Sequence, residues 1–151
     1  MNNRVVFPGS FDPFTLGHLN LMERALPLFD FIIVAIGENA EKKTLFPIEK
    51  RIEWIEAIFL NEPKVSVEKY TGLTVDFCKQ RNARYILRGI RNTNDFEYEK
   101  SIAQMNKEIS GIETIFFITE PQFAVISSSA IRDIIRHGSD ASKFLPPQIK
   151  I

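Results

Sequence analysis

Two periods of apolar residues alternate along the chain. Five short runs rich in β-branched and aromatic residues predict strands, and they lie at residues 4–7, 31–36, 64–68, 84–87 and 113–118. Three of these runs are almost continuously apolar, as expected for strands covered on both faces of a sheet.

Between the predicted strands the period changes to that of an amphipathic helix. Apolar residues three and four positions apart predict helices over 19–29, 48–59 and 98–109, and shorter helices are predicted over 74–81 and from the serine run to Gly138. Strand and helix therefore alternate five times. This order predicts an α/β fold with a single Rossmann-like, doubly wound, five-stranded parallel sheet and helices on both faces. Residues 1–151 contain no linker or low-complexity segment, so one domain is predicted.

The segment after the first strand, FPGSFDPFTLGH at residues 7–18, is long for its place and contains two prolines. Ligands of such sheets bind at the carboxyl ends of the strands, so this loop is a candidate site. Thr15 is placed to cap the next helix, whose first N–H groups and dipole would form an anion site facing His18. A histidine in a first helical turn is also a common surface residue, so the loop alone leaves the role of His18 open.

Three more polar clusters follow predicted strands. Lys42 and Lys43 follow the second strand, although paired lysines in a polar loop are usually only solvated charges. Arg88 and Arg91 follow the fourth strand, and their guanidinium groups match phosphate oxygens in shape. Serines 127–129 follow the fifth strand at a helix start. Because the fold would bring all four strand ends together, they jointly predict a phosphate-binding site.

Composition and missing motifs exclude several classes of function. Nineteen basic and 19 acidic residues give a net charge of zero, which argues against bulk binding of nucleic acid. The sequence has no G-x-G-x-x-G after the first strand, no P-loop and no G-x-S-x-G, and its one cysteine and two histidines do not suggest a zinc site. The lone Cys78 and the absence of a leader or a long apolar run predict a cytoplasmic protein without membrane contact.

The motifs together resemble a known family. Residues 15–18, TLGH, resemble the T/H-x-G-H signature of the nucleotidyltransferase superfamily that is related to class I aminoacyl-tRNA synthetases. Over nearly the whole chain, PGSFDPFTLGH, the lysine pair, RGIRNTNDFEYE and ISSSAIR resemble in order and spacing the bacterial phosphopantetheine adenylyltransferases. The resemblance implies transfer of AMP from ATP to 4′-phosphopantetheine, which gives dephospho-coenzyme A and pyrophosphate. It also implies Mg²⁺ as cofactor, a homohexamer built as a dimer of trimers, and coenzyme A as a feedback ligand.

The resemblance further implies a role for individual residues. The implied catalytic residues are His18, Lys42 and Arg91. The implied ATP-binding residues are Ser10, Phe11, His18, Gly89, Ile90, Arg91, Glu99, Phe123, Ala124, Val125, Ile126, Ser127, Ser128 and Ser129. The implied acceptor-binding residues are Ser10, Lys42, Thr74, Arg88, Tyr98, Met105 and Asn106.

Two positions depart from the family pattern, and two other readings stay open. Position 10 is often threonine in the family and is Ser10 here, and Thr74 stands where a larger apolar residue is common. One alternative is an enzyme with another acceptor, such as a nicotinate-mononucleotide adenylyltransferase or a cytidylyltransferase. The other is a non-catalytic nucleotide sensor, against which the presence of both Lys42 and His18 argues.

Overall fold

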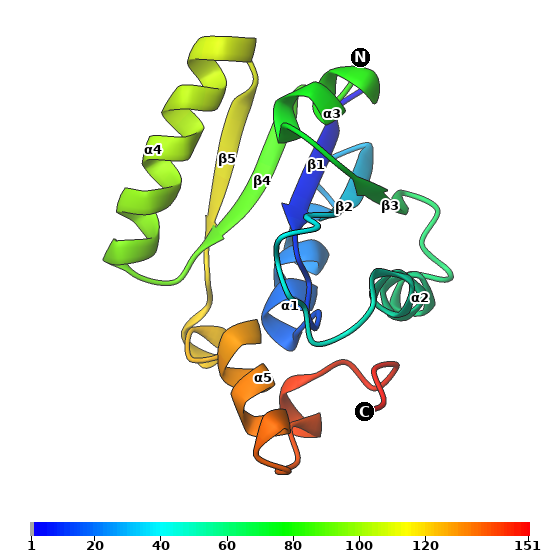
Figure 1. Cartoon of the computed structure of the whole chain (residues 1–151). Coiled ribbons are helices and arrows are strands. Elements are labelled where there is room, and N and C mark those ends of the chain that lie inside the picture. Colours follow the sequence, from blue (N-terminus) through cyan, green and yellow to red (C-terminus); the bar gives the residue numbers. More distant parts are fainter. Residues whose placement is uncertain (1) are drawn as a thin grey trace.

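The computed structural model describes residues 2–151 and contains a parallel sheet whose spatial order is β3-β2-β1-β4-β5 (Figure 1). The strands are β1 (Arg4–Gly9), β2 (Phe31–Gly37), β3 (Val65–Tyr70), β4 (Tyr85–Ile90) and β5 (Glu113–Ile118). The chain winds outward from β1 in one direction to β3, and then in the other direction through β4 to β5. The predicted fold class is confirmed, and the point where the winding reverses lies between β1 and β4, where ligands of such sheets bind.

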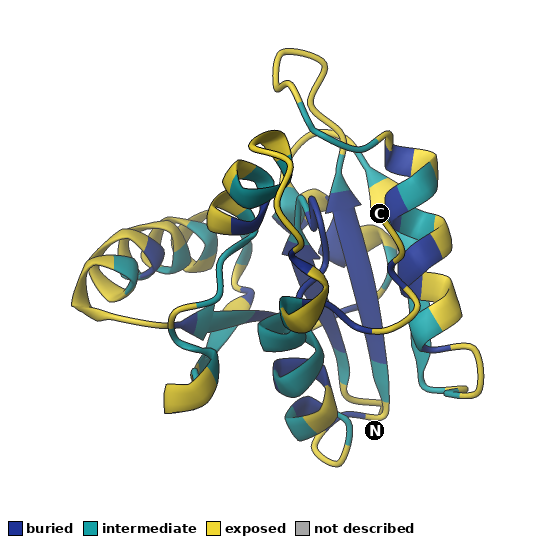
Figure 2. Ribbon diagram, turned by 90° about the horizontal axis from the view of Figure 1, so that it is seen from below, coloured by how far each residue is buried: buried dark blue, intermediate teal, exposed yellow. Residues whose placement is uncertain are grey.

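Five helices cover the two faces of this sheet. They are α1 (Leu16–Ala25), α2 (Ile48–Ile58), α3 (Thr74–Gln80), α4 (Thr93–Ser110) and α5 (Ser128–Arg136), with 3-10 turns at Pro121–Phe123 and Ser142–Phe144. Side chains alternate across β1, so that Val5 and Phe7 pack with α1, α2 and α5, whereas Val6 packs with α3. The strands in the centre are the most deeply buried part of the chain (Figure 2). Cys78 lies in the α3 layer fully buried, and burial raises the pKa of its thiol to about 12.

The longest helix, α4, exposes its apolar stripe. The helix itself is confirmed, but its apolar stripe is exposed, with Tyr98 68% and Met105 61% accessible, while Glu99 is buried. α4 packs against β4 and the edge strand β5 (Figure 1), and its buried side carries Glu99. Among residues 2–151, no helix is both long enough and apolar enough to cross a bilayer.

Candidate functional site

Two cavities open side by side at the carboxyl ends of β1 and β4. The first, of about 430 Å³, reaches toward α3 and α4 and is called the α4 cavity here. The second, of about 450 Å³, reaches toward α1 and the start of α5 and is called the α5 cavity. Their shared wall consists of Pro8, Gly9, Ser10, Lys42, Arg88 and Glu99. The structure therefore offers two compartments of ligand size that meet at cationic and hydroxyl groups.

The predicted site residues divide between the two cavities according to their implied ligand. The implied acceptor residues all line the α4 cavity except Met105. The implied ATP residues all line the α5 cavity except Ile90, Ala124 and Val125. The segments that the fold was expected to bring together are therefore neighbours, although they come from four different strand ends.

Lys42 and Ser10 join the first two strand ends directly. The Nζ of Lys42 donates a hydrogen bond of 2.6 Å to the Oγ of Ser10, across the loops that follow β2 and β1. Lys43 is exposed and lines neither of these cavities. The two lysines are therefore not equivalent, because only Lys42 reaches the wall between the two cavities.

His18 is held in the α5 cavity by a reciprocal cap. Thr15 precedes α1, and its Oγ accepts a hydrogen bond from the backbone N–H of His18, while the backbone N–H of Thr15 donates to Nδ1 of His18 over 2.9 Å. Because Nδ1 is the acceptor, the proton of the neutral ring lies on Nε2. The ring therefore presents a fixed N–H donor, and the predicted capping role of Thr15 is confirmed.

The environment of His18 keeps the ring neutral. Three phenylalanine rings surround it, those of Phe7, Phe11 and Phe14, at centroid distances of 5.0–6.1 Å. Burial, together with the positive charges of Arg88 and Arg91, lowers the pKa of His18 to about 3. The sequence could not give the charge state of this histidine, because its aromatic neighbours depend on how β1 and the loop after it place their rings around α1.

The low pKa of His18 makes the stability of the folded chain depend on pH, and His18→Gln should remove this contribution. Between about pH 3 and pH 6.5 the unfolded chain binds a proton at His18 that the folded chain does not, so stability falls as the pH falls through this window. We expect the free energy of unfolding of the wild type to fall by about 2 kcal/mol more than that of His18→Gln between pH 7 and pH 5. Urea unfolding at pH 7 and at pH 5 measures these free energies. His137→Gln, at the exposed second histidine, is the matched control and should keep the wild-type dependence; an equal fall in His18→Gln would contradict the assignment.

Arg88 is fixed by a buried carboxylate. Its Nε and Nη2 donate to the two oxygens of Glu99 over 3.0 and 2.5 Å, and its Nη1 donates to the carbonyl of Pro8 over 2.6 Å. Glu99 is 9% exposed, so its carboxylate is shielded from water, whereas the side chain of Arg88 is 33% exposed and stays accessible from the cavities. The guanidinium fork of Arg88 is therefore oriented before any ligand binds.

Arg91 has a looser partner at the start of α4. Its Nε donates to the carboxylate of Asp95 over 3.1 Å, and Asn92 caps the helix by accepting from the N–H of Asp95. The side chain of Arg91 is 38% exposed and lines the α5 cavity. An exposed ion pair of this kind is weak, so an anionic ligand can compete with Asp95 for Arg91.

The serine run uses its first two hydroxyls to build the site. Ser127 caps α5 by accepting from the N–H of Ala130, and Ser128 donates to the carbonyl of Pro13 over 2.8 Å. All three serines line the α5 cavity. The predicted cap is confirmed, and the run also ties α5 to the loop after β1.

Four predicted residues lie outside both cavities. Ile90 is buried beneath the end of β4, whereas Ala124 and Val125 lie in the turn before α5, where Val125 is 80% exposed. Met105 is exposed on α4 beside Asn106, which does line the α4 cavity. Their implied roles in binding stay predictions.

Sequence reasoning missed two buried charged residues next to the site. Asp12, 2% exposed, accepts hydrogen bonds from the backbone of Leu45 and Phe46, and Arg132 of α5 donates to its carbonyl. Arg51, 4% exposed, donates to the carbonyls of Ser10 and Phe46. The sequence did contain a signal for Arg51, because this residue lies on the apolar side of a predicted helix. An arginine is rarely buried there unless it has hydrogen-bond partners.

The carboxylates of the α5 cavity do not form a protein cage for a metal. Across residues 2–151, no three side chains of the types that bind metals gather closely enough to hold one. Each of the nearby carboxylates already has a partner: Asp12 has two backbone N–H groups, Asp95 has Arg91 and Glu99 has Arg88. The donor set therefore fits an ion that is held mainly by the phosphate oxygens of a ligand, which is a common way for Mg²⁺ to bind.

Comparisons with known proteins agree with this geometry. Residues 6–134 match the family described as cytidylyltransferase-like. Phosphopantetheine adenylyltransferases from Flavobacterium psychrophilum and Phocaeicola vulgatus are 52% and 48% identical to the chain over 148 residues, which cover 98% of the chain and 98% of each relative. Among solved structures, a bifunctional NMN adenylyltransferase/ADP ribose pyrophosphatase from Francisella tularensis superposes with a TM-score of 0.74 at 19% identity, over 96% of this chain and 45% of that chain. The last similarity concerns the fold alone.

Proposed function

The chain belongs to the cytidylyltransferase-like family and, within it, to the phosphopantetheine adenylyltransferases, and from this premise we propose how its two cavities divide the work. The enzyme transfers AMP from ATP to 4′-phosphopantetheine and releases dephospho-coenzyme A and pyrophosphate. We assign ATP to the α5 cavity and the acceptor to the α4 cavity. The single observation that carries this assignment is the wall that the cavities share, where Ser10, Lys42 and Arg88 face both.

The reaction joins the two compartments across this wall. An oxygen of the acceptor phosphate attacks the α-phosphorus of ATP, a new P–O bond forms, and the bond between the α-phosphorus and the bridging oxygen breaks as pyrophosphate leaves. The acceptor phosphate is already a nucleophile, so the protein needs neither a covalent residue nor a strong base. What it supplies is position and stabilisation of charge.

Different side chains stabilise the negative charge on the acceptor phosphate and on the phosphates of ATP. Lys42 lies at the wall, where it neutralises negative charge on the acceptor phosphate and on the α-phosphate. His18 offers its Nε2–H to the triphosphate, beside the first turn of α1, and Arg91 offers a further cation in the same cavity. Arg88 orients the acceptor phosphate, because Glu99 and Pro8 already hold its guanidinium in place.

Mg²⁺ belongs to this proposal as a companion of the nucleotide. The chain's own carboxylates near the α5 cavity are occupied by other partners, so the ion would be held by phosphate oxygens and water. When bound, it would neutralise charge on the phosphates of ATP and of the leaving pyrophosphate.

Assembly and regulation are proposed with the same enzyme. The exposed stripe of α4, with Tyr98, Ile102, Met105 and Ile109, supports association with further copies of the chain, and we propose a homohexamer arranged as a dimer of trimers. We also propose that coenzyme A, which contains both halves of the product, binds across the two cavities as a feedback ligand. A cytoplasmic location fits an enzyme that uses ATP.

One assay separates the proposed function from its alternatives. Purified protein is incubated with ATP, Mg²⁺ and one of several phosphorylated acceptors, and pyrophosphate is measured. We expect release with 4′-phosphopantetheine and none with nicotinate mononucleotide. Release with another acceptor only would replace the substrate, and binding of ATP without release from any acceptor would favour a nucleotide sensor.

A further inference from the structure

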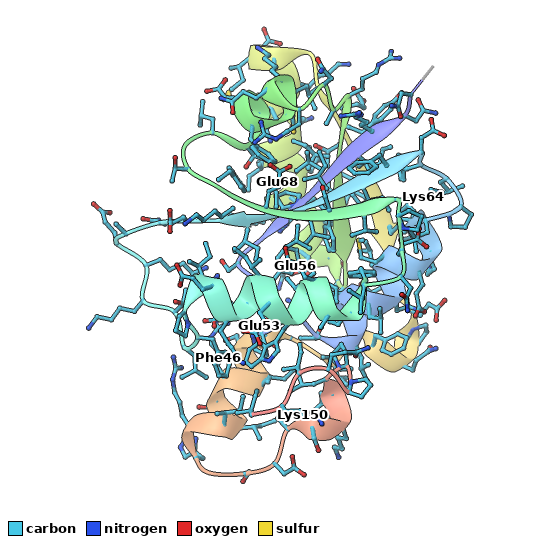
Figure 3. All side chains as sticks on the ribbon, turned by 90° about the vertical axis from the view of Figure 1, so that its right-hand side faces the viewer. Phe46, Glu53, Glu56, Lys64, Glu68 and Lys150 are labelled. Atoms are coloured by element: carbon cyan, nitrogen blue, oxygen red, sulfur yellow. The ribbon has the colours of Figure 1, made fainter. Side chains whose placement is uncertain are left out.

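A buried arginine lies behind the reaction centre without lining either cavity. Arg51, on the first turns of α2, is 4% exposed. Its Nη1 donates to the carbonyl of Ser10 over 2.6 Å and its Nε donates to the carbonyl of Phe46 over 3.0 Å. Figure 3 shows Phe46 at the start of α2, so one guanidinium spans the loop after β1 and the loop that leads into this helix.

A second buried group ties the same two loops together. The carboxylate of Asp12 accepts hydrogen bonds from the backbone N–H groups of Leu45 and Phe46, over 2.7 and 2.9 Å. Asp12 is 2% exposed, so these charge-assisted bonds are shielded from water. The loop after β1 is thus bonded to residues 45–46 by an arginine from one side and a carboxylate from the other.

The bond between Lys42 and Ser10 lies inside this frame. Arg51 holds the backbone of Ser10, whose Oγ accepts from Lys42. Further along the loop, Asp12 holds the chain three and four residues after Lys42, and Arg51 holds it four residues after. Lys42 itself is exposed on a polar loop, where a lysine side chain is otherwise free to move. Both ends of the Lys42–Ser10 bond therefore depend on the same guanidinium.

We propose that Arg51 is a positioning residue for the adenylyl transfer, which fixes the ammonium of Lys42 and the hydroxyl of Ser10 at the wall between the two cavities. The inference rests on the proposed function. Arg51 does not line either cavity, so it acts through Lys42 and Ser10 and not through the substrates.

The partners of Arg51 distinguish this role from a contribution to stability alone. Within residues 2–151 Arg51 forms no ion pair at bonding distance, and both of its bonds end on loop carbonyls. Burial lowers the pKa of Arg51, an effect that the nearby charges of Asp12, Glu49 and Glu38 oppose. An apolar side chain would pack at this place on α2 without that desolvation cost. The arginine is therefore explained by the geometry of the two carbonyls.

The test compares two substitutions that differ in their donors. Arg51→Met keeps an unbranched, flexible side chain and removes both hydrogen bonds, whereas Arg51→Lys keeps the charge and a single donor nitrogen in place of the guanidinium fork. We expect Arg51→Met to lower kcat about 10- to 100-fold with the KM for ATP changed less than about twofold, because misplacing a catalytic group by about 1 Å has effects of that size. Arg51→Lys should lie between Arg51→Met and the wild type. Arg81→Met removes a partly exposed arginine that pairs with Glu68 outside both cavities, and it should keep the wild-type kcat.

A double-mutant cycle with Lys42→Met separates positioning from stability. If Arg51 acts through the Lys42–Ser10 bond, Arg51→Met should lower the residual kcat of Lys42→Met by less than about twofold, because that bond and the charged group that it positions are already gone. Losses that multiply would overturn the inference. An unchanged kcat in folded Arg51→Met would overturn it as well, and if that variant does not fold, a wild-type kcat in Arg51→Lys would do so. Failure of the wild type to release pyrophosphate with 4′-phosphopantetheine would instead overturn the proposed function.

Discussion

His18→Ala is expected to lower kcat about 100- to 1,000-fold, the usual effect of losing one preorganised donor to a developing charge. The KM for ATP should change by less than about threefold, because the Nε2–H strengthens its bond as charge builds up on the phosphates and contributes less to the ground state. The structure gives this donor its direction, since the backbone N–H of Thr15 occupies Nδ1. Steady-state kinetics with ATP as the varied substrate measures both constants.

The second histidine of the chain provides the control for this experiment. His137 lies exposed at the end of α5, where its Nδ1 contacts the carbonyl of Asp133, and His137→Ala should keep the wild-type kcat. His18→Asn tests the neutral-donor role, because it offers an uncharged N–H and should recover part of the loss of His18→Ala. If His18→Ala weakens ATP binding and leaves kcat unchanged, His18 binds the ground state and the proposed role is wrong.

The sequence predicted the fold well because the strands carry a strong local signal. β1 and β2 are buried on both faces, so their apolar runs are continuous, and alternation with helices left few arrangements of the sheet. Helix ends were also predictable, since Thr15, Ser127 and Gly138 act through contacts with their immediate neighbours. The exposure of the apolar stripe of α4 was not predictable, because the spacing of apolar residues shows that a helix has an apolar side but not what covers that side.

The site was predictable as a set of strand ends and not as a network of bonds. The position of Lys42 after β2 follows from sequence order, but its bond to Ser10 depends on where two loops cross. The same holds for the bonds from Asp12 to residues 45 and 46 and from Arg51 to Ser10, which join positions more than 30 apart along the chain. The neutral state of His18 depends on three phenylalanine rings, one from β1 and two from the loop that follows it, which come together only in the folded chain. Residue types and topology thus identify the chemistry, whereas charge state and positioning need coordinates.

Lys42→Met is expected to lower kcat about 100- to 1,000-fold and also to weaken binding of the acceptor. The ammonium lies at the wall that both cavities share. It would therefore bind the acceptor phosphate in the ground state and stabilise the negative charge that develops around the α-phosphorus in the transition state. We expect the KM for 4′-phosphopantetheine to rise about 10-fold, the worth of one charge-assisted bond, while the KM for ATP changes less. Kinetics with each substrate varied in turn, and titration of the acceptor alone, measure these effects.

The adjacent lysine makes this prediction specific to position and not to charge. Lys43→Met removes the same charge one residue further along the loop, from a side chain that is exposed and lines neither cavity, and it should keep both constants within about twofold. Equal losses in the two variants would mean that the loop acts only through its net charge. An unchanged affinity for the acceptor in Lys42→Met would leave Arg88, already oriented by Glu99 and Pro8, as the group that binds the acceptor phosphate. Lys42 would then act only on the transition state, and its bond to Ser10 would matter for the position of the ammonium alone.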